Sequence, residues 1–266
     1  MQLKGIIQNK YKLMAIVIGV YLLTDLLLHK GLARVLMPKK FPSGKINYST
    51  PQNNNGLMNT GKEWAKGINT ISLMQAVNLK CPGLECDIYF DINNKKFDVH
   101  HDQSNSSVLN LDDLLKAYTD RGLQASVWLD FKNLSDTNKV QSMLELLRLR
   151  RKYGLSNKLL VESSRAEMLK PFADSGFYTA YYPPVFNPYL ISDSSILQWA
   201  DSLNLVVNHS TLNAISGYYY QFPFLHHYFP NYPILIWSGS DRFSLVNWWF
   251  RRKIASDNTL FIALYP

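Results

Sequence analysis

Cysteine is scarce in this chain, with only Cys81 and Cys86 among 266 residues. The sequence is therefore not that of a disulfide-rich scaffold, and two cysteines do not fix the redox compartment. The chain also has no Gly-rich phosphate loop, no G-x-S-x-G nucleophile elbow and no internal repeat. These absences argue against a P-loop nucleotide site, an α/β-hydrolase and a solenoid.

Acidic residues are nearly missing from the first 62 positions. That segment holds nine Lys or Arg against the single acid Asp25, and it accounts for the whole formal net charge of +8. The remaining 204 residues carry 19 basic and 19 acidic groups, which cancel. The rest of the chain has no bulk positive field, so we expect no nucleic-acid partner.

The N-terminal basic residues bracket an apolar run from Leu13 to Leu28, with Lys10 and Lys12 just before it. At about 1.5 Å per residue, this run spans most of a bilayer's hydrocarbon of about 30 Å, although Asp25 is costly there. We expect residues 1–30 to form a cytoplasmic tail and a single-pass signal anchor, with the remainder on the extracytoplasmic side of the membrane. A cleaved signal peptide and a buried amphipathic helix are the alternatives.

The stretch that follows is rich in Pro, Gly and Asn, which predicts a flexible linker over residues 31–61. The folded domain is expected over residues 62–266, where short β-type runs alternate with helical patterns. The expected strands are 64–69, 84–90, 125–131, 158–163, 177–181, 205–208, 234–238 and 260–264. Eight β/α alternations in about 200 residues predict an α/β fold, a (β/α)8 TIM barrel with reactive groups at the C-terminal ends of its strands.

Two acids share one face of the second expected strand. Side chains alternate along a strand, so Glu85 and Asp87 project the same way, and His101 follows in the next extended segment. The third strand ends with Asp130 and Lys132 on one face. Three carboxylates from neighbouring strands suit Mg²⁺ or Ca²⁺, and a lysine beside them suits a phosphate group.

These motifs resemble those of a known group of enzymes. The E-x-D at 85–87, the H-D at 101–102 and the D-x-K at 130–132 resemble, in order and spacing, the glycerophosphodiester phosphodiesterase and sphingomyelinase-D-like superfamily of TIM barrels and the related menorin group. The leucine-rich stretch at 108–115 and the I-W-S at 236–238 extend the resemblance, which covers residues 63–266.

The resemblance implies roles for particular side chains. Glu85, Asp87 and Asp130 would bind the divalent cation, His101 would act as general acid/base or nucleophile, and Lys132 would contact the phosphate. Strand alternation lets only one of the pair face the pocket, and we favour His101 over His100 because Asp102 follows it. Trp237 either lines the pocket or is an ordinary core residue.

One position departs from the pattern. The family carries a second catalytic histidine on its first strand, and here Lys66 stands in that place, with Asn69 nearby as a pocket hydrogen-bonder. An ammonium can bind phosphate, or act as an acid if burial lowers its pKa, but it does not simply replace an imidazole. His209, at the end of the expected sixth strand, either supplies the missing imidazole or is a structural histidine.

The resulting hypothesis is a membrane-anchored, divalent-metal-dependent phosphodiesterase that acts on glycerophosphodiesters or phospholipid headgroups. The alternative is a catalytically impaired barrel that binds a phospholipid or a protein partner, because of Lys66.

Overall fold

The computed structural model describes residues 2–28, 40–101, 109–239 and 244–265. It divides into two compact units, one made of Met1–Lys40 and Asp241–Asp257 and the other of Phe41–Ser240 and Asn258–Pro266. The larger unit holds every strand and is described first.

Eight parallel strands form a closed barrel. They pair in chain order, and the first strand pairs with both the second and the last, which closes the ring. The parallel strands are β1 (Glu63–Ala65), β2 (Gly83–Asp91), β4 (Ser126–Phe131), β5 (Leu159–Ser163), β6 (Tyr178–Tyr181), β7 (Ala214–Tyr218), β8 (Ile234–Trp237) and β9 (Leu260–Tyr265). The short β3 (Lys96–Val99) runs antiparallel to β2 as a hairpin. The predicted (β/α)8 barrel is confirmed.

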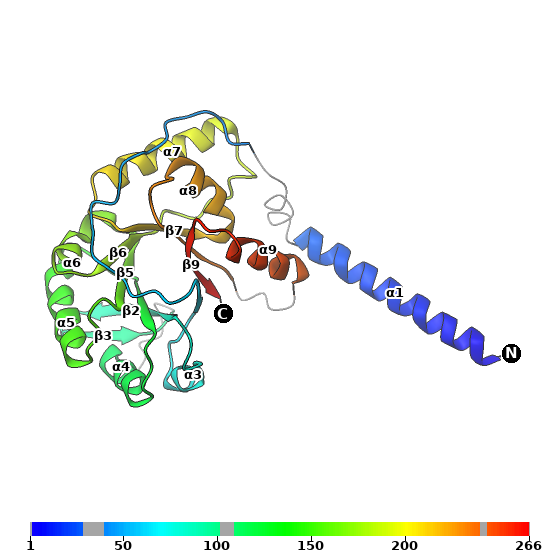
Figure 1. The fold of residues 1–266 in the computed structure, drawn as a ribbon, viewed down its shortest axis with the longest axis horizontal. Coiled ribbons are helices and arrows are strands. Elements are labelled where there is room, and N and C mark those ends of the chain that lie inside the picture. Colours follow the sequence, from blue (N-terminus) through cyan, green and yellow to red (C-terminus); the bar gives the residue numbers. More distant parts are fainter. Residues whose placement is uncertain (1, 29–39, 102–108, 240–243, 266) are drawn as a thin grey trace. The chain divides into compact units, whose positions relative to one another are not determined.

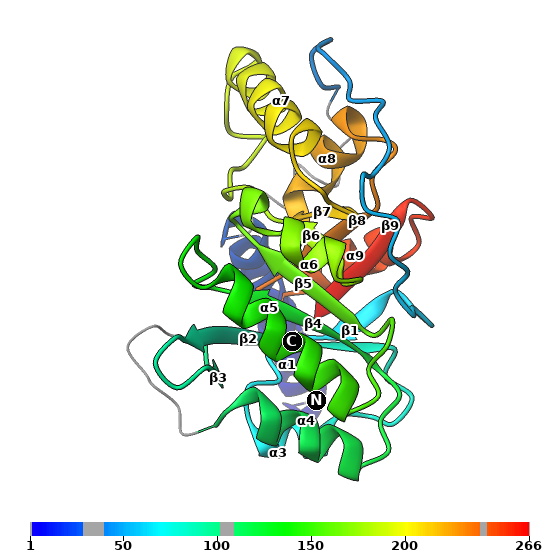
Figure 2. The ribbon, with the colours of Figure 1, turned by 90° about the vertical axis from the view of Figure 1, so that its left-hand side faces the viewer.

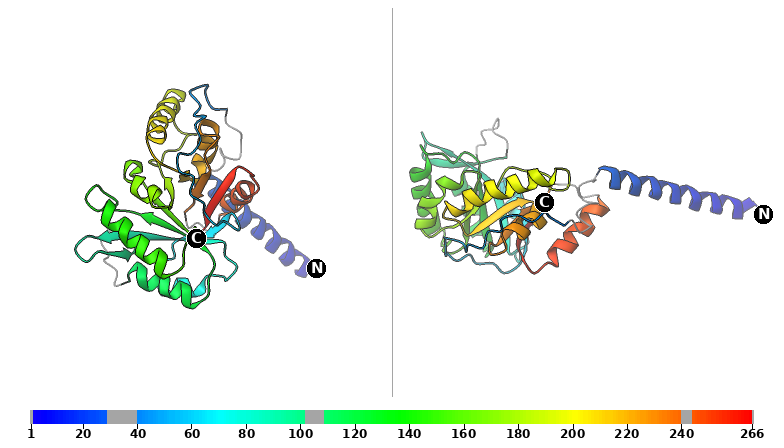
Figure 3. Two further views of the ribbon diagram at one scale, coloured as in Figure 1. Left: turned by 60° about the vertical axis from the view of Figure 1, so that its left-hand side comes forward. Right: turned by 90° about the horizontal axis from the view of Figure 1, so that it is seen from above.

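The helices of this unit lie outside the strands, as Figures 1 and 2 show for α4, α5 and α6. They are α3 (Ile71–Ala76), α4 (Leu111–Asp120), α5 (Lys139–Lys152), α6 (Lys170–Asp174), α7 (Asp193–Asn208) and α8 (Phe222–Tyr228), with 3₁₀ turns η1 (Ala166–Met168) and η2 (Tyr219–Gln221). Viewed along another direction, the strands fan around a common centre inside this layer (Figure 3, left). Inside the barrel, large side chains such as Trp64, Trp128 and Tyr178 fill the core.

One expected strand is wrong. Residues 205–208 form the last turn of α7, and the strand that follows is β7, at Ala214–Tyr218. The β-branched residues Val206 and Val207 favour a strand in the sequence. In the structure, however, the buried residues of this segment recur at helical spacing, at Ile196, Ala200, Leu203 and Val207. His209 is the C-cap of α7 and is exposed, so it does not supply an imidazole to the pocket.

Residues 41–61, expected to be a flexible linker, hydrogen-bond to the barrel along their length. Asn53 donates from Nδ2 to the carbonyl of Phe177 and to Thr179 Oγ1, both at 3.0 Å. In return, Asn213 donates from Nδ2 to the carbonyl of Asn53 at 2.7 Å. Leu57 packs against the barrel core. Because Phe177, Thr179 and Asn213 lie at or next to strand starts, this segment covers the N-terminal end of the barrel.

The smaller unit holds α1 (Gln2–Leu28) and α9 (Leu245–Ala255), which are in contact. Helix α1 contains the apolar run of the sequence, and Figure 1 shows it as one uninterrupted helix. Among the residues that the structure describes, however, no helix is both long and apolar enough to cross a membrane. The single-pass anchor expected over residues 1–30 is therefore not supported in this part of the chain; Lys10, Lys12 and Asp25 lie within the same helix.

Gly83 provides a test of how closely β1 and β2 approach. A Cβ added at Gly83 would lie 2.0 Å from the indole ring of Trp64, which is buried in the barrel core. We expect Gly83→Ala to lower the free energy of unfolding by at least about 2 kcal/mol, because neither the ring nor the strand has room to move. Urea unfolding followed by circular dichroism measures this change.

Gly56→Ala is the matched control, since a Cβ there meets nothing within 4 Å. It should change the free energy of unfolding by less than about 0.5 kcal/mol. An equal effect of the two substitutions would contradict the close approach of Trp64 to β2.

Candidate active site

Three carboxylates meet on the inner face of the barrel. Strand β2 supplies Glu85 and Asp87, and the neighbouring β4 supplies Asp130, which is in register with Asp87. One oxygen from each lies within 4.8 Å of the others. Among the described residues, this is the one group of three or more acids, histidines or cysteines that is arranged to hold a metal ion. The alternation of β2 thus places Glu85 and Asp87 on one face, as the E-x-D motif predicts.

The loop after β1 fixes the orientation of the two acids on β2. The chain turns at Gly67, whose φ of 73° is favourable for glycine, and its N–H donates to Glu85 Oε2 at 2.7 Å. Asn69 donates from Nδ2 to Asp87 Oδ2 at 2.6 Å and accepts from the Asp87 N–H at 2.9 Å. Asn69 is therefore committed to holding Asp87, and the cavity is lined by other residues.

Lys132 binds two of the three carboxylates, those of Asp87 and Asp130. Its ammonium donates to Asp87 Oδ1 at 2.8 Å and makes a short contact with Asp130 Oδ2. Burial alone would lower the pKa of Lys132, but the Asp130 and Asp87 carboxylates raise it, so the ammonium stays charged. In this structure Lys132 contacts two predicted metal ligands.

The charges of the three carboxylates favour the binding of a cation. Burial, with the charges of Asp87 and Asp130, raises the pKa of Glu85 to about 8, and burial also raises the pKa of Asp130. The second oxygen of Asp130, Oδ1, is buried and accepts no hydrogen bond from the residues that the structure describes. A hard divalent cation prefers carboxylate oxygens, relieves their mutual repulsion and would satisfy this oxygen, so the donor set fits Mg²⁺ or Ca²⁺.

A cavity of about 200 Å³ opens over these groups. Its lining includes most of the side chains singled out in the sequence, namely Lys66, Glu85, Asp87, His101, Asp130, Lys132 and Trp237. They come from β2, β4 and β8 and from the segments that follow β1, β3 and β4. Closure of the barrel brings these distant parts of the chain together.

Lys66 extends from the end of β1 across the cavity toward β8. Its ammonium donates to the carbonyl of Ser238 at 3.0 Å and lies 5.0 Å from the centre of the Trp237 ring, a cation–π contact. An ammonium has three N–H donors. The described residues take one of them in a hydrogen bond, so Lys66 retains donors for a ligand in the cavity.

The histidine pair divides as strand alternation predicts. His101 lines the cavity, whereas His100 stacks on Tyr89 with ring centres 4.3 Å apart and does not line it. The His100 N–H donates to the carbonyl of Asp87 at 3.2 Å, which ties the end of β3 to the strand that carries the acids. Asp102, the second residue of the H-D motif, lies outside the described residues.

Four lining residues were not anticipated: the polar Glu162 and Tyr182 and the apolar Val185 and Leu264. Glu162 lies on β5 in register with Asp130 and accepts hydrogen bonds from Trp128 Nε1 at 3.0 Å and from the hydroxyl of Ser216. Burial raises the pKa of Glu162, and the charge of Asp130 raises it further. A single acid directly after the apolar run Leu159-Leu160-Val161 was the signal for it in the sequence.

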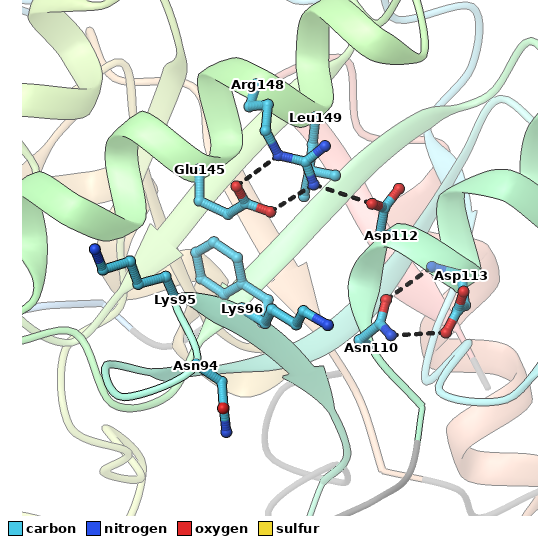
Figure 4. Close-up of a pocket in the computed structure, with 10 residues that line it drawn as sticks. Asn94, Lys95, Lys96, Asn110, Asp112, Asp113, Glu145, Arg148 and Leu149 are labelled. Atoms are coloured by element: carbon cyan, nitrogen blue, oxygen red, sulfur yellow. Dashed lines mark hydrogen bonds and ion pairs between the residues drawn. The ribbon is translucent and has the colours of Figure 1, made fainter.

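A larger cavity of about 390 Å³ lies on the outer side of the barrel, next to α4, α5 and the β2–β3 hairpin. Figure 4 shows that its main charged groups already face one another: Arg148 binds both oxygens of Glu145 and one oxygen of Asp112. Although burial opposes it, hydrogen bonds from Lys152, Tyr153 and Arg148 lower the pKa of Asp112 to about 2. This network clamps α4 to α5, so we place the candidate active site in the smaller cavity.

The chain was compared with known proteins. No family model and no curated protein sequence matches it. Solved structures do match. A glycerophosphodiester phosphodiesterase from Parabacteroides distasonis is 12% identical, with a TM-score of 0.52 over 79% of this chain and 94% of that one. One from Agrobacterium tumefaciens is 17% identical, with a TM-score of 0.51 over 77% and 96%.

An Oleispira antarctica phosphodiesterase, solved in complex with the product sn-glycerol-3-phosphate, is 10% identical, with a TM-score of 0.52 over 77% of this chain and 92% of that one. At these identities the likeness concerns the path of the backbone. The chain therefore has the TIM-barrel fold of the glycerophosphodiester phosphodiesterases.

Proposed function

We propose that this chain is a divalent-metal-dependent phosphodiesterase that acts on glycerophosphodiesters or phospholipid headgroups. The observation that carries the proposal is the cluster of Glu85, Asp87 and Asp130, with one buried oxygen left unpartnered, in a cavity that also holds two lysines and a histidine. Carboxylates, ammonium groups and an imidazole are the groups that phosphodiester cleavage requires. The Oleispira enzyme's complex with sn-glycerol-3-phosphate supports a glycerophosphodiester as the substrate.

The three carboxylates would hold Mg²⁺ or Ca²⁺. When bound, the cation neutralises phosphodiester oxygens and stabilises the charge that develops during cleavage. Asn69 and the Gly67 N–H keep Asp87 and Glu85 oriented, and Lys132 keeps Asp87 and Asp130 together.

Lys66, rather than Lys132, is the lysine available to bind the substrate phosphate. Lys132 contacts Asp87 and Asp130, whereas Lys66 uses one donor on the Ser238 carbonyl and lines the same cavity. We therefore assign Lys66 to bind the phosphate and His101 to attack phosphorus or transfer the proton at the scissile bond. The neighbouring His100 stacks on Tyr89 and serves to hold β3 in place.

A second candidate function is a barrel that binds a phosphodiester without turnover. The observation that favours it is Lys66 itself, which occupies the position of an expected histidine and rests on Trp237 and the Ser238 carbonyl. An ammonium at this place binds an anion through its charge and its N–H donors but does not supply an imidazole.

Metal binding should strengthen as the pH rises. The ligands must be deprotonated, and burial raises the pKa of Glu85 to about 8, so the apparent affinity for Mg²⁺ should increase by up to about tenfold per pH unit between about pH 6 and pH 8. Isothermal titration calorimetry at three pH values measures this slope. Glu85→Gln should weaken binding and flatten the slope, and Glu167→Gln, at an exposed acid, should do neither.

The raised pKa of Glu85 also predicts how the free energy of unfolding depends on pH when no metal is bound. Glu85 holds its proton in the folded chain up to about pH 8 and loses it near 4.5 when unfolded, so the free energy of unfolding should fall as the pH rises between these values. Excess Mg²⁺ should remove this fall. A pH-independent affinity, with no effect of Glu85→Gln, would rule out this carboxylate as a ligand.

Turnover is tested with glycerophosphocholine, glycerophosphoinositol and lysophospholipids, with Mg²⁺ or with a chelator. We expect hydrolysis or cyclisation only with the metal, and losses of about 100-fold or more in kcat/KM for Asp130→Asn and His101→Asn. His100→Asn is the matched control and should retain most of the activity. If no substrate turns over and Asp130→Asn changes nothing, the enzyme assignment is abandoned.

Variants at Lys66 separate the two candidate functions. If Lys66 binds the phosphate of a substrate that is cleaved, Lys66→Met should lower kcat/KM by about 10-fold to 100-fold, mainly by raising KM. Lys170→Met, at an exposed lysine on α6, is the control. An inactive natural chain that becomes active as Lys66→His would instead identify a barrel impaired at this position.

A further inference from the structure

The smaller unit carries most of the exposed apolar surface of the described residues. Of 24 large hydrophobic side chains that are exposed, 15 lie on α1 or α9. On α1 they follow one another almost without interruption from Tyr11 to Leu27, and on α9 they are Leu245, Trp248 and Trp249. Exposed apolar surface gathered in this way marks an interaction site.

Four of the exposed side chains described on helix α9 form one stripe. Leu245, Trp248, Trp249 and Arg252 follow at intervals of three and four residues, so they share a face, whereas Ile254 is buried. The two indoles are 56% and 52% exposed, and the Arg252 guanidinium lies 5.4 Å from the ring centre of Trp248. Tryptophan beside arginine and lysine is the composition that the headgroup layer of a membrane favours.

The exposed charges described in this unit are basic. Among the residues that the structure describes, its exposed ionisable groups with charge near neutral pH are Lys10, Lys12, Lys40, Arg252 and Lys253. Among the described residues its acids are Asp25, which is 5% exposed, and Asp257, which is half-buried. An apolar surface bordered by cations complements an anionic lipid surface, whereas a second copy pairing through α9 would bring Arg252 and Lys253 against their equivalents.

We propose that the unit formed by α1 and α9 binds the surface of a bilayer that contains anionic phospholipids. The apolar side chains of the two helices insert between headgroups, and the lysines and Arg252 contact lipid phosphates. Binding of this kind requires no helix to cross the membrane. It goes beyond the phosphodiesterase activity and does not depend on it, but it would hold the chain where phospholipids are concentrated.

The test uses the full chain and sedimentation with vesicles, either of phosphatidylcholine alone or with about 30% phosphatidylserine. We expect binding to the mixed vesicles at least about tenfold tighter than to the neutral ones, and weakened by about 0.5 M salt. A blue shift of tryptophan fluorescence should accompany binding. Failure to sediment with either type of vesicle would overturn the proposal.

Two double variants separate the apolar and the charged contributions. Trp248→Ser with Trp249→Ser should weaken binding to the mixed vesicles by about tenfold or more, and Arg252→Gln with Lys253→Gln should remove most of the preference for anionic lipid. The matched control is Leu190→Ser with Leu205→Ser, two residues of the larger unit that are 61% and 65% exposed. Equal effects of the tryptophan and control variants would contradict a lipid-binding role for α9.

Two further measurements separate this proposal from self-association and from the proposed catalytic function. Light scattering without lipid detects self-association, and a dimer that the tryptophan variant dissociates, with no vesicle binding, would identify a second copy as the occupant and overturn the proposal. Asp130→Asn should bind vesicles like the natural chain. Loss of turnover with intact vesicle binding thus tests the catalytic assignment alone, and loss of vesicle binding with intact turnover on soluble substrates tests this one alone.

Discussion

The ammonium of Lys132 lies between Asp87 and Asp130, two carboxylates that β2 and β4 place side by side on the inner face of the barrel. Without a positive charge at this point, three buried carboxylates would repel one another where little water screens them. Lys132 offsets part of that repulsion, and the raised pKa of Glu85 shows that part remains. The three carboxylates are arranged so that they could hold a cation in addition to the lysine, and the proposed chemistry uses this arrangement.

Buried side chains of the barrel core hold the strands that carry these carboxylates. Trp64 and Trp128 fill the barrel core below the carboxylates, and Trp128 also donates to Glu162. Gly83 lets the ring of Trp64 lie directly against β2, two residues before Glu85. At the N-terminal end of the barrel, residues 41–61 cover the core through Leu57 and the side chain of Asn53. The acids are thus held on strands whose spacing a packed core determines.

Lys66 distinguishes this site from the expected pattern, which has a histidine at this position. It reaches from the end of β1 to the Ser238 carbonyl and the Trp237 ring at the end of β8, two strands separated in the ring by β9. A lysine in this place supplies charge and hydrogen-bond donors. In the proposed reaction, proton transfer would then be left to His101, so that binding of the phosphate and transfer of the proton would fall to different side chains.

The sequence by itself determined the barrel, the common face of Glu85 and Asp87, and the division between His100 and His101, because each follows from alternation along a strand or from local β/α periodicity. It misassigned residues 205–208, where β-branched residues occupy the end of a helix. It missed the attachment of residues 41–61, whose hydrogen bonds join residues more than 100 positions apart. Tertiary structure alone decided that Lys132 contacts the acids, that Glu162 joins the cavity and that Lys66 rests on Trp237. These contacts depend on the stagger and closure of the strands, which fix the distances between segments that no local pattern relates.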